Sequence, residues 1–376
     1  MIIKLGEVAS FVNGYAFKPS DWSDNGMPII RIQDLTGNSY KMNRYNGDIE
    51  QKYKVQDGDV LISWSASLGV YVWHGENAVL NQHIFKVVFD KTDVSKDYFV
   101  YQIEYRLGNA ASEAHGATMK HLTKSVFNAL PFYLPKKEEQ EKIAKVLNKI
   151  TELTNKTRKQ AKLLDDIIKS RFIELFGDPV SNPLKWDMKS LLKMGYCKNG
   201  MNFHTGDSGI EVHCLGVGDF KDYAIIDRTE NLPMISLKEM PSNENMLQDG
   251  DIVFVRSNGN KALVGRCVIV YPHNILTTYS GFCIRYRLTG DEVIGIYLLQ
   301  VLKTDSMRKK MAGRGANIQN LNQQILASLN IPLPPIELQN QFADFVAHVD
   351  KSKLAVQKSL DELETLKKSL MQEYFG

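Results

Sequence analysis

One loop of the sequence gathers side chains that could read the edges of nucleic-acid bases. The segment RSNGNKALVG, residues 256–265, carries Arg256, Asn258, Asn260 and Lys261 beside glycines. Guanidinium and amide groups form paired hydrogen bonds with guanine and adenine, and lysine can hold phosphate. We interpret this loop as the best base-reading candidate in the chain, with an ordinary hairpin loop as the alternative.

A second set of candidates lies in the first half of the chain. The stretch SWSASLG, residues 63–69, follows a predicted strand as residues 256–265 do, and it is too small and polar for a core strand. Its candidates are Trp64 and Ser65. Three more residues lie upstream, where they could equally be solvated strand positions: Arg31, Gln33 and Arg44.

Basic residues beside glycines suit contacts with phosphate. The segment RKKMAGRGANIQN, residues 308–320, has this composition, and its counterpart earlier in the chain is also basic. We assign phosphate contacts in these two segments to Lys120, Lys309 and Arg314. Such local patches matter more than the net charge of the chain, which is only +3.

The sequence carries no convincing catalytic motif. It contains neither GxGxxG nor GxxxxGK followed by Ser or Thr, so we expect no cofactor or ATP site in this chain. Asp34 with Glu50 and Lys52 fits a loose nuclease pattern that is frequent by chance. Cys197 and Cys214, with nearby histidines, match no zinc spacing, so we expect no metal site. Recognition without catalysis is the preferred interpretation.

The bulk composition is that of a folded chain with more than one domain. With 376 residues, of which 43% are hydrophobic, the chain can build two or more cores. It has no apolar run long enough to span a membrane, so we expect no membrane partner. The start MIIKLGEVAS lacks the features of a signal peptide, which favours a cytoplasmic protein.

The chain is a tandem repeat. Residues 116–177 align without a gap to residues 315–376, at an offset of 199. Upstream, VQDGDVLIS at 55–63 matches LQDGDIVFV at 247–255 with a smaller offset, so the loops differ in length between the copies. The candidate segments around residues 64 and 256 therefore occupy the same place in the two copies.

Each copy has a globular part and a helical part. DGDVLIS and HIFKVVF read as strands, and DYFVYQIEYRL has helical spacing, which indicates an α+β globule. Residues 136–176 then form one helix, about 60 Å long, that Gly177 and Pro179 should end.

The apolar stripe of this helix is narrow, as in a coiled coil. We expect the two helices to pair antiparallel as spacers, while packing of each helix along its own globule is the alternative. The seam positions are Ile143, Ile150, Leu164, Ile168 and Phe172 in the first copy, and Phe342, Val349, Val356, Leu363 and Leu370 in the second.

This arrangement resembles the specificity (S) subunit of a type I restriction–modification enzyme. The resemblance covers essentially the whole chain and rests on the corner LPxxxEQ, followed by a long helix that ends in FG, and on its double occurrence. The best-matching pieces are GATMKHLTKSVFNALPFYLPKKEEQEKIAKVLNKI and GANIQNLNQQILASLNIPLPPIELQNQFADFVAHV. The second corner departs slightly, because Leu338 precedes Gln339 where the first has Glu.

The resemblance implies an α+β fold of two target-recognition globules and two paired helices with pseudo-two-fold symmetry. The expected segments are a first recognition domain at 1–133, a first helix at 134–177, a linker at 178–190, a second recognition domain at 191–332 and a second helix at 333–376.

The resemblance also implies the partners. They are double-stranded DNA, read as a split site, two modification (methyltransferase) subunits and the restriction (nuclease-translocase) subunits. S-adenosylmethionine, ATP and magnesium would belong to those subunits and not to this chain. Two alternatives stay open, a stand-alone nuclease with tandem domains and a coiled-coil scaffold that does not touch DNA.

Overall fold

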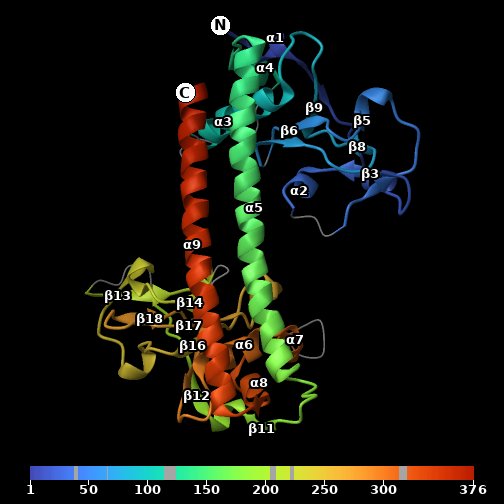
Figure 1. The fold of residues 1–376 in the computed structure, drawn as a ribbon. Helices are drawn as coiled ribbons and strands as arrows, with labels where there is room; N and C mark the ends of the chain where they lie inside the picture. The colour runs from blue at the N-terminus through green and yellow to red at the C-terminus, as the bar shows by residue number, and fades with distance from the viewer. Residues whose placement is uncertain (38–40, 66, 114–123, 204–208, 221–223, 313–319) are drawn as a thin grey trace. The chain divides into compact units, whose positions relative to one another are not determined.

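The computed structural model describes residues 1–37, 41–65, 67–113, 124–203, 209–220, 224–312 and 320–376 (Figure 1). The chain divides into two compact units: unit 1 is Met1–Lys159 with Gln357–Gly376, and unit 2 is Gln160–Val356. The divisions fall inside two long helices, α5 (Lys137–Phe176) and α9 (Ile336–Phe375). Each unit therefore holds one globule and a part of both helices, and the expected fold class of two mixed globules with two long helices is confirmed.

In its described residues, the globule of unit 1 contains two four-stranded sheets and a two-stranded ribbon. Their strand orders are β2-β9-β6-β7, β4-β3-β8-β5 and β1-β10. Neighbouring strands are antiparallel except β3 and β8. The strands are β1 (Ile2–Lys4), β2 (Ser10–Asn13), β3 (Met27–Ile30), β4 (Arg44–Tyr45), β5 (Lys54–Val55), β6 (Val60–Ser63), β7 (Gly69–Val72), β8 (Ala78–Leu80), β9 (Ile84–Val88) and β10 (Pro131–Tyr133). The shorter helices are α1 (Leu5–Val8), α2 (Ile32–Leu35), α3 (Lys96–Glu113) and α4 (Lys124–Ala129).

The described part of unit 2 repeats this plan with longer strands. The orders are β12-β19-β16-β17-β14, β15-β13-β18 and β11-β20, with parallel pairing between β13 and β18 and between β14 and β17. The strands are β11 (Asp187–Ser190), β12 (Gly195–Asn199), β13 (Ile210–Leu215), β14 (Ile225–Ile226), β15 (Met234–Leu237), β16 (Asp251–Val255), β17 (Cys267–Val270), β18 (Thr277–Tyr279), β19 (Cys283–Leu288) and β20 (Asn330–Leu333). The shorter helices are α6 (Gly295–Lys303), α7 (Asp305–Ala312) and α8 (Gln323–Ala327).

The connection between the copies is shorter than the sequence indicates. Helix α5 ends at Phe176, and Gly177 follows with φ of +73°, a left-handed conformation that glycine adopts without strain. Strand β11, however, lies inside the expected linker 178–190 and pairs antiparallel with β20. Its sequence DMKS has no strong strand pattern, and only the pairing with β20 reveals that the second globule already begins there.

A buried glutamine fixes the start of each long helix. Gln339 is fully buried; its Nε2 donates to Pro334 O (2.9 Å) and Glu292 O (3.1 Å), and its Oε1 accepts from Ile294 N (2.9 Å). One side chain thus joins the corner before α9 to the segment that enters α6.

The first copy repeats two of these three bonds. Gln140 Nε2 donates to Pro135 O (2.9 Å), and Ser95 N donates to Gln140 Oε1 (2.8 Å). The glutamine of the repeated corner is therefore a bracket between the long helix and its own globule.

The end of each long helix packs in the unit where the other helix begins. Phe375, at the end of α9, packs edge-to-face on Tyr98 of unit 1 at 5.5 Å between ring centroids. Phe176, at the end of α5, packs likewise on Tyr297 of unit 2 at 4.8 Å. Tyr98 and Tyr297 occupy the same place in the two copies; burial raises the pKa of both phenols, and each donates a hydrogen bond to a carbonyl of the strand before the corner.

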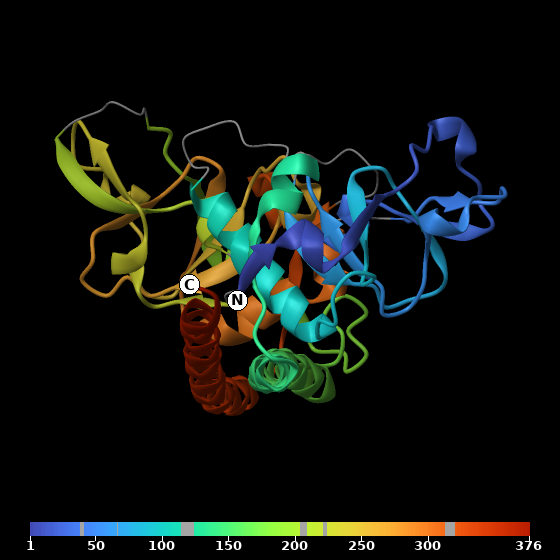
Figure 2. The same cartoon turned by 90° about the horizontal axis from the view of Figure 1, so that it is seen from above.

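Helices α5 and α9 run antiparallel within each unit. In unit 1, Arg158 Nη2 lies 2.7 Å from Glu364 Oε1, while the first turns of α5 lie beside the last turns of α9 (Figure 2). In unit 2, Lys353 Nζ lies 2.7 Å from Asp165 Oδ1, and Phe172 packs on Phe342. As residue numbers rise along one helix, those of its neighbour fall.

The ten predicted seam residues are all buried or half-buried, but several of them also contact a globule. Buried are Ile143, Ile150, Ile168, Phe172, Phe342 and Val349, and half-buried are Leu164, Val356, Leu363 and Leu370. Ile143 belongs to the core of unit 1, and Phe172 and Phe342 to the core of unit 2. Pairing between helices and packing on a globule thus occur together. Among the described residues, no helix is long and apolar enough to cross a membrane.

The buried glutamine gives a test of stability. Gln339→Ala removes three hydrogen bonds and leaves Ile294 N and Pro334 O without that partner, so it should lower the free energy of unfolding of unit 2 by about 3 kcal/mol. Hydrogen exchange at the amides of Ile294 and of helix α6 measures the loss. Gln160→Ala, at an exposed position of α5, is the control and should change it by less than about 0.5 kcal/mol. Equal exchange rates in both variants would contradict the claim that the hydrogen bonds of Gln339 stabilise unit 2.

Candidate nucleic-acid interface

Strand β16 of unit 2 leads directly into the predicted base-reading loop. The backbone N–H of Arg256 donates to Phe282 O (2.8 Å), and its Nη1 donates weakly to Gly281 O (3.4 Å). Phe282 itself is 62% exposed, which is unusual for a phenyl ring. Arg256 is half-buried, so its guanidinium lies at a surface that already presents an apolar ring and backbone carbonyls.

The two asparagines of the loop shape its backbone. Asn258 Oδ1 accepts from Asn260 N (2.8 Å), and Asn260 Oδ1 accepts from Ala262 N (3.1 Å). These are Asx turns, in which the amide oxygen is engaged while its nitrogen carries two further donors. Paired bonds with adenine need that oxygen too, so in this conformation the loop favours contacts through its donors. Residue 261 lies in the same loop, but its side chain is outside the described residues.

The equivalent position in unit 1 is filled differently. Trp64 is half-buried: it stacks on Phe85 of the core at 5.8 Å and lies 5.6 Å from the ring of His83. Ser65 is only 5% exposed, so its hydroxyl does not lie on the outer surface. Trp64 and Ser65 therefore lie between the core of unit 1 and its outer surface, and they support the surface residues by packing.

Sequence reasoning missed the turn that lies next to both candidates. Gln82 and His83 are exposed in unit 1, with their Nε2 atoms 3.3 Å apart, and Gly281 and Phe282 occupy the same place in unit 2. Trp64 N donates to His83 O (3.4 Å), just as Arg256 N donates to Phe282 O. The offset of 199 aligns these turns. The sequence feature that could have identified them is their position directly before a predicted strand in both copies.

Exposed aromatic rings extend this surface in unit 1. Tyr15, 41% exposed, pairs with Asn81 through a β-bridge and packs on Phe17 at 5.0 Å and on Tyr53 at 5.5 Å. Lys52 Nζ lies 4.8 Å from the ring of Tyr53. Rings interleaved with a cation suit contact with sugars, bases and phosphates.

Of the three upstream candidates, two are engaged by neighbouring carboxylates. Arg31 N donates to Asp34 Oδ2 (2.8 Å), which caps α2; Gln33 lies in this helix, whereas Arg31 is the extended residue before it and Arg44 lies in strand β4. Arg44 Nη2 lies 2.6 Å from Glu76 Oε1, and this hydrogen bond holds the pKa of the Glu76 carboxyl below its ordinary value. A phosphate would have to displace Glu76. Gln33 is exposed.

The predicted phosphate contacts are only partly visible. Lys309 is exposed on α7. Lys120 and Arg314 lie outside the described residues.

The described residues bring no catalytic constellation together. Asp34 serves as a helix cap, and Lys52 Nζ lies 2.8 Å from Glu50 Oε2, so the loose nuclease pattern is divided between two local contacts. No group of three or more His, Cys, Asp or Glu side chains suited to a metal occurs there. Burial raises the pKa of the Cys197 and Cys214 thiols to about 12, which disfavours the thiolate that a metal needs.

Comparison with known proteins identifies the family to which this chain belongs. Residues 1–164 and 218–365 match the family model described as the type I restriction modification DNA specificity domain. The type I restriction enzyme EcoBI specificity subunit of Escherichia coli is 23% identical over 99% of this chain and 85% of that protein. The MjaVIII specificity subunit of Methanocaldococcus jannaschii is 22% identical over 84% of this chain and 78% of that protein.

Two solved structures share the fold. The type I restriction-modification S subunit from M. genitalium superimposes with a TM-score of 0.52 at 15% identity, covering 100% of this chain and 96% of that one. A chain from a study of complex assembly and conformational transition of the type I R-M system gives 0.54 at 15% identity, covering 100% and 97%.

Arg256 gives the most direct test of the interface. If its guanidinium grips a guanine, Arg256→Ala should weaken binding to a tightly bound duplex by about 1–3 kcal/mol and leave binding to unrelated duplexes almost unchanged. Fluorescence anisotropy with both duplexes measures the difference. Arg171→Ala, which removes an arginine of α5 that pairs with Glu174, is the matched control. Equal affinities for Arg256→Ala and wild type on the tight duplex would remove this loop from the interface.

Proposed function

Because this chain belongs to the family of type I restriction–modification DNA specificity subunits, we propose that it reads a bipartite DNA site on behalf of partner subunits. Each unit reads one half of the site. The chain itself is not catalytic: modification subunits methylate an adenine and restriction subunits cleave. The adenine is flipped out of the duplex into a partner's pocket.

One observation carries this proposal: the two units keep the same internal bonds and differ where they meet solvent. The glutamine bracket and the buried tyrosine recur at equivalent positions. At the ends of β6 and β16, by contrast, Trp64 is replaced by Arg256, and His83 by Phe282. A common frame with two different surfaces suits the reading of two different base sequences.

Both long helices support a fixed spacing between the half-sites. Each runs without interruption from residues of one unit to residues of the other, which supports a separation of the half-sites that depends on helix length. Two modules that bind one face of B-DNA lie about 34–36 Å apart per helical turn. A spacer of fixed length would therefore keep both modules aligned with their half-sites.

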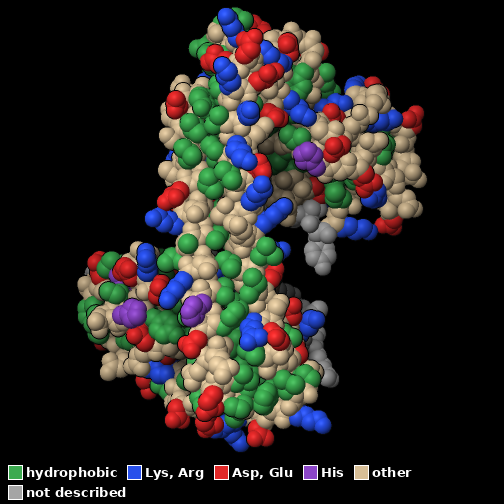
Figure 3. Space-filling view, viewed as in Figure 1, with side chains coloured by type: hydrophobic (Ala, Val, Ile, Leu, Met, Phe, Trp, Pro, Cys, Tyr) green, Lys and Arg blue, Asp and Glu red, His purple; other side chains and the backbone are tan. Residues whose placement is uncertain are grey.

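Exposed apolar side chains on the helices support docking of two modification subunits. Figure 3 shows apolar side chains over α5 and α9. The exposed large apolar residues of the two helices are Val146, Leu153, Leu163, Ile167, Ile173, Leu354 and Leu366. Where such side chains form a contiguous patch on the outside of a helix, the patch is typical of a surface that a partner covers. The repeat offers such helices twice, which fits two copies of one partner. S-adenosylmethionine, ATP and magnesium are then bound by the partners.

Lengthening both long helices tests whether they set the spacing between the half-sites. Four residues inserted in α5 between Lys159 and Gln160, and four in α9 between Val356 and Gln357, add about 6 Å, close to two base-pair steps. The contacts within each unit are preserved because both helices grow together. We expect the same half-site bases with about two more unread base pairs between them, measured by sequencing methylated adenines in cells that also express the modification partner.

Two further variants control this experiment. Insertion in α5 alone leaves the helices unequal, and two residues inserted in both helices turn each by about 200°, so neither variant should methylate. If the doubly lengthened chain methylates with the original spacing, the helices do not set the distance between the half-sites.

A further inference from the structure

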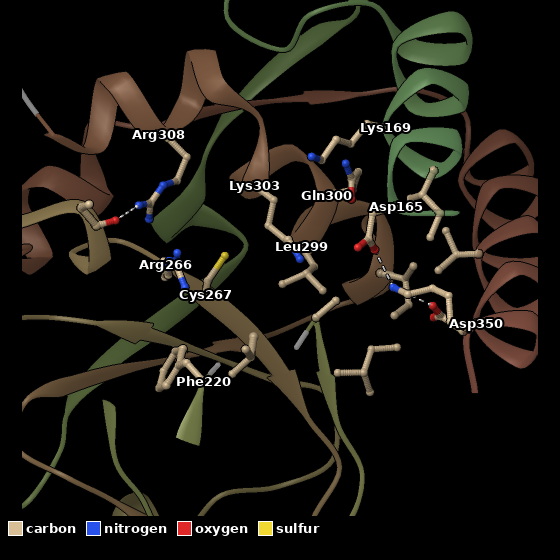
Figure 4. A pocket seen from close by; sticks show the side chains of 18 residues that line it. Asp165, Lys169, Phe220, Arg266, Cys267, Leu299, Gln300, Lys303, Arg308 and Asp350 are labelled. Carbon is tan, nitrogen blue, oxygen red and sulfur yellow. Dashed lines mark hydrogen bonds and ion pairs between the residues drawn. The ribbon is translucent and has the colours of Figure 1, made fainter. Parts of the chain in front are cut away.

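A hollow of about 460 Å³ lies within unit 2, bordered by α5, α6, α7, α9 and the strands β14 and β17 (Figure 4). Its apolar wall includes Phe220, Ile296, Leu299 and Val346. Ala262 also lines it and belongs to the loop 256–265. The hollow therefore adjoins the loop that shapes the interface.

The side chains that line the hollow carry an excess of positive charge. Five cationic residues face two acidic ones. They are Lys169, Arg266, Lys303, Arg308 and Lys353, against Asp165 and Asp350. Both acids are used by one lysine, since Lys353 Nζ lies 2.7 Å from Asp165 Oδ1 and 3.5 Å from Asp350 Oδ1. The cationic side chains of the lining therefore outnumber its acidic ones, and a third acid, Asp166, lies outside the lining at 3.7 Å from Lys169 Nζ.

Lys303 and Arg308 each leave a donor without a hydrogen-bond partner among the described residues. Lys303 Nζ has neither a hydrogen-bond nor an ion-pair partner there, and burial lowers its pKa, with Asp165 opposing this effect and Lys353 and Lys169 adding to it. Arg308 Nη2 donates to Ala262 O (3.0 Å), whereas its Nη1 is buried and unbonded within the described structure. A buried cation without a counter-charge is unfavourable, so a ligand that supplies negative charge here would be held strongly.

The first copy shows that this charge is not needed for the fold. In unit 1, Glu104 stands where unit 2 has Lys303, and it lies 3.0 Å from Lys367, whose equivalent in unit 2 is Ile168. Two further cations are likewise unmatched in unit 1, with Gly69 in place of Arg266 and Asn109 in place of Arg308. Three positions that carry no positive charge in one copy are thus all cationic in the other.

We propose that this hollow is a binding site for a small phosphate-bearing molecule. Lys303 and Arg308 bind its phosphate groups, and the wall formed by Phe220 and Leu299 accommodates an apolar or aromatic part. Since Arg308 also holds Ala262 O, a bound phosphate would fix the base-reading loop from behind and so affect how unit 2 reads DNA. Lys303 is half-buried among helices, which favours a small anion over the rigid backbone of duplex DNA.

Inorganic pyrophosphate is the probe, added to the full-length chain without DNA. The wild type should show a melting temperature that rises with pyrophosphate concentration, and calorimetry gives the affinity. Lys303→Gln should weaken this affinity by at least about tenfold, the loss expected for a charge-assisted contact. Without ligand it should be no less stable than the wild type, because it removes a half-buried charge whose burial disfavours the charged form. Lys193→Gln, at an exposed position outside the hollow, should bind as the wild type does.

The results that would overturn the site are equally specific. Absence of pyrophosphate binding by the wild type, or equal affinity in Lys303→Gln, would do so. A parallel titration with duplex DNA separates the two sources of phosphate. If Lys303→Gln weakens DNA binding and no small anion binds, the hollow serves the DNA backbone and the proposal is wrong. If this binding proposal fails, the proposal that the two units read a bipartite DNA site is not affected.

Discussion

The bracket formed by a buried glutamine amide is the contact on which the rest of each unit depends. Gln140 and Gln339 each tie the proline corner before a long helix to the segment that enters the preceding globular helix. An amide is suited to this task because it donates and accepts at once, and a buried backbone group without a partner would cost about 1–3 kcal/mol. With this bracket in place, the angle between globule and helix is set by the backbone, and the surface loops are free to differ.

The second constraint is the aromatic end of each helix. Phe176 and Phe375 are almost fully buried, and each packs on the tyrosine of the unit in which the other helix starts. The core of each unit is thus completed by a residue from the far end of the other helix. Each unit therefore needs segments from both long helices to complete its core.

Much of this plan could be predicted from the sequence, because repetition and periodicity are local signals. The long helices, their stop at Gly177 and the strands at DGDVLIS and DGDIVFV follow from such patterns. Strand β11 could not be found, since DMKS becomes a strand only by pairing with β20, far away in the chain. The residues of the interface were even harder to predict from the sequence. Gln82, His83 and Phe282 reach the surface through the turn before β9 or β19, and sequence alone does not tell an outward ring from a core ring. Glu76 likewise meets Arg44 only after folding.

We propose that one frame, used twice, presents two different surfaces to two separate stretches of DNA. The most direct measurement is selection from a random duplex library by the purified chain in complex with its modification partner, followed by sequencing of the bound DNA. The account predicts two short sets of fixed bases separated by an unread spacer of constant length. Enrichment of one contiguous site, or of two sets at variable separation, would contradict it.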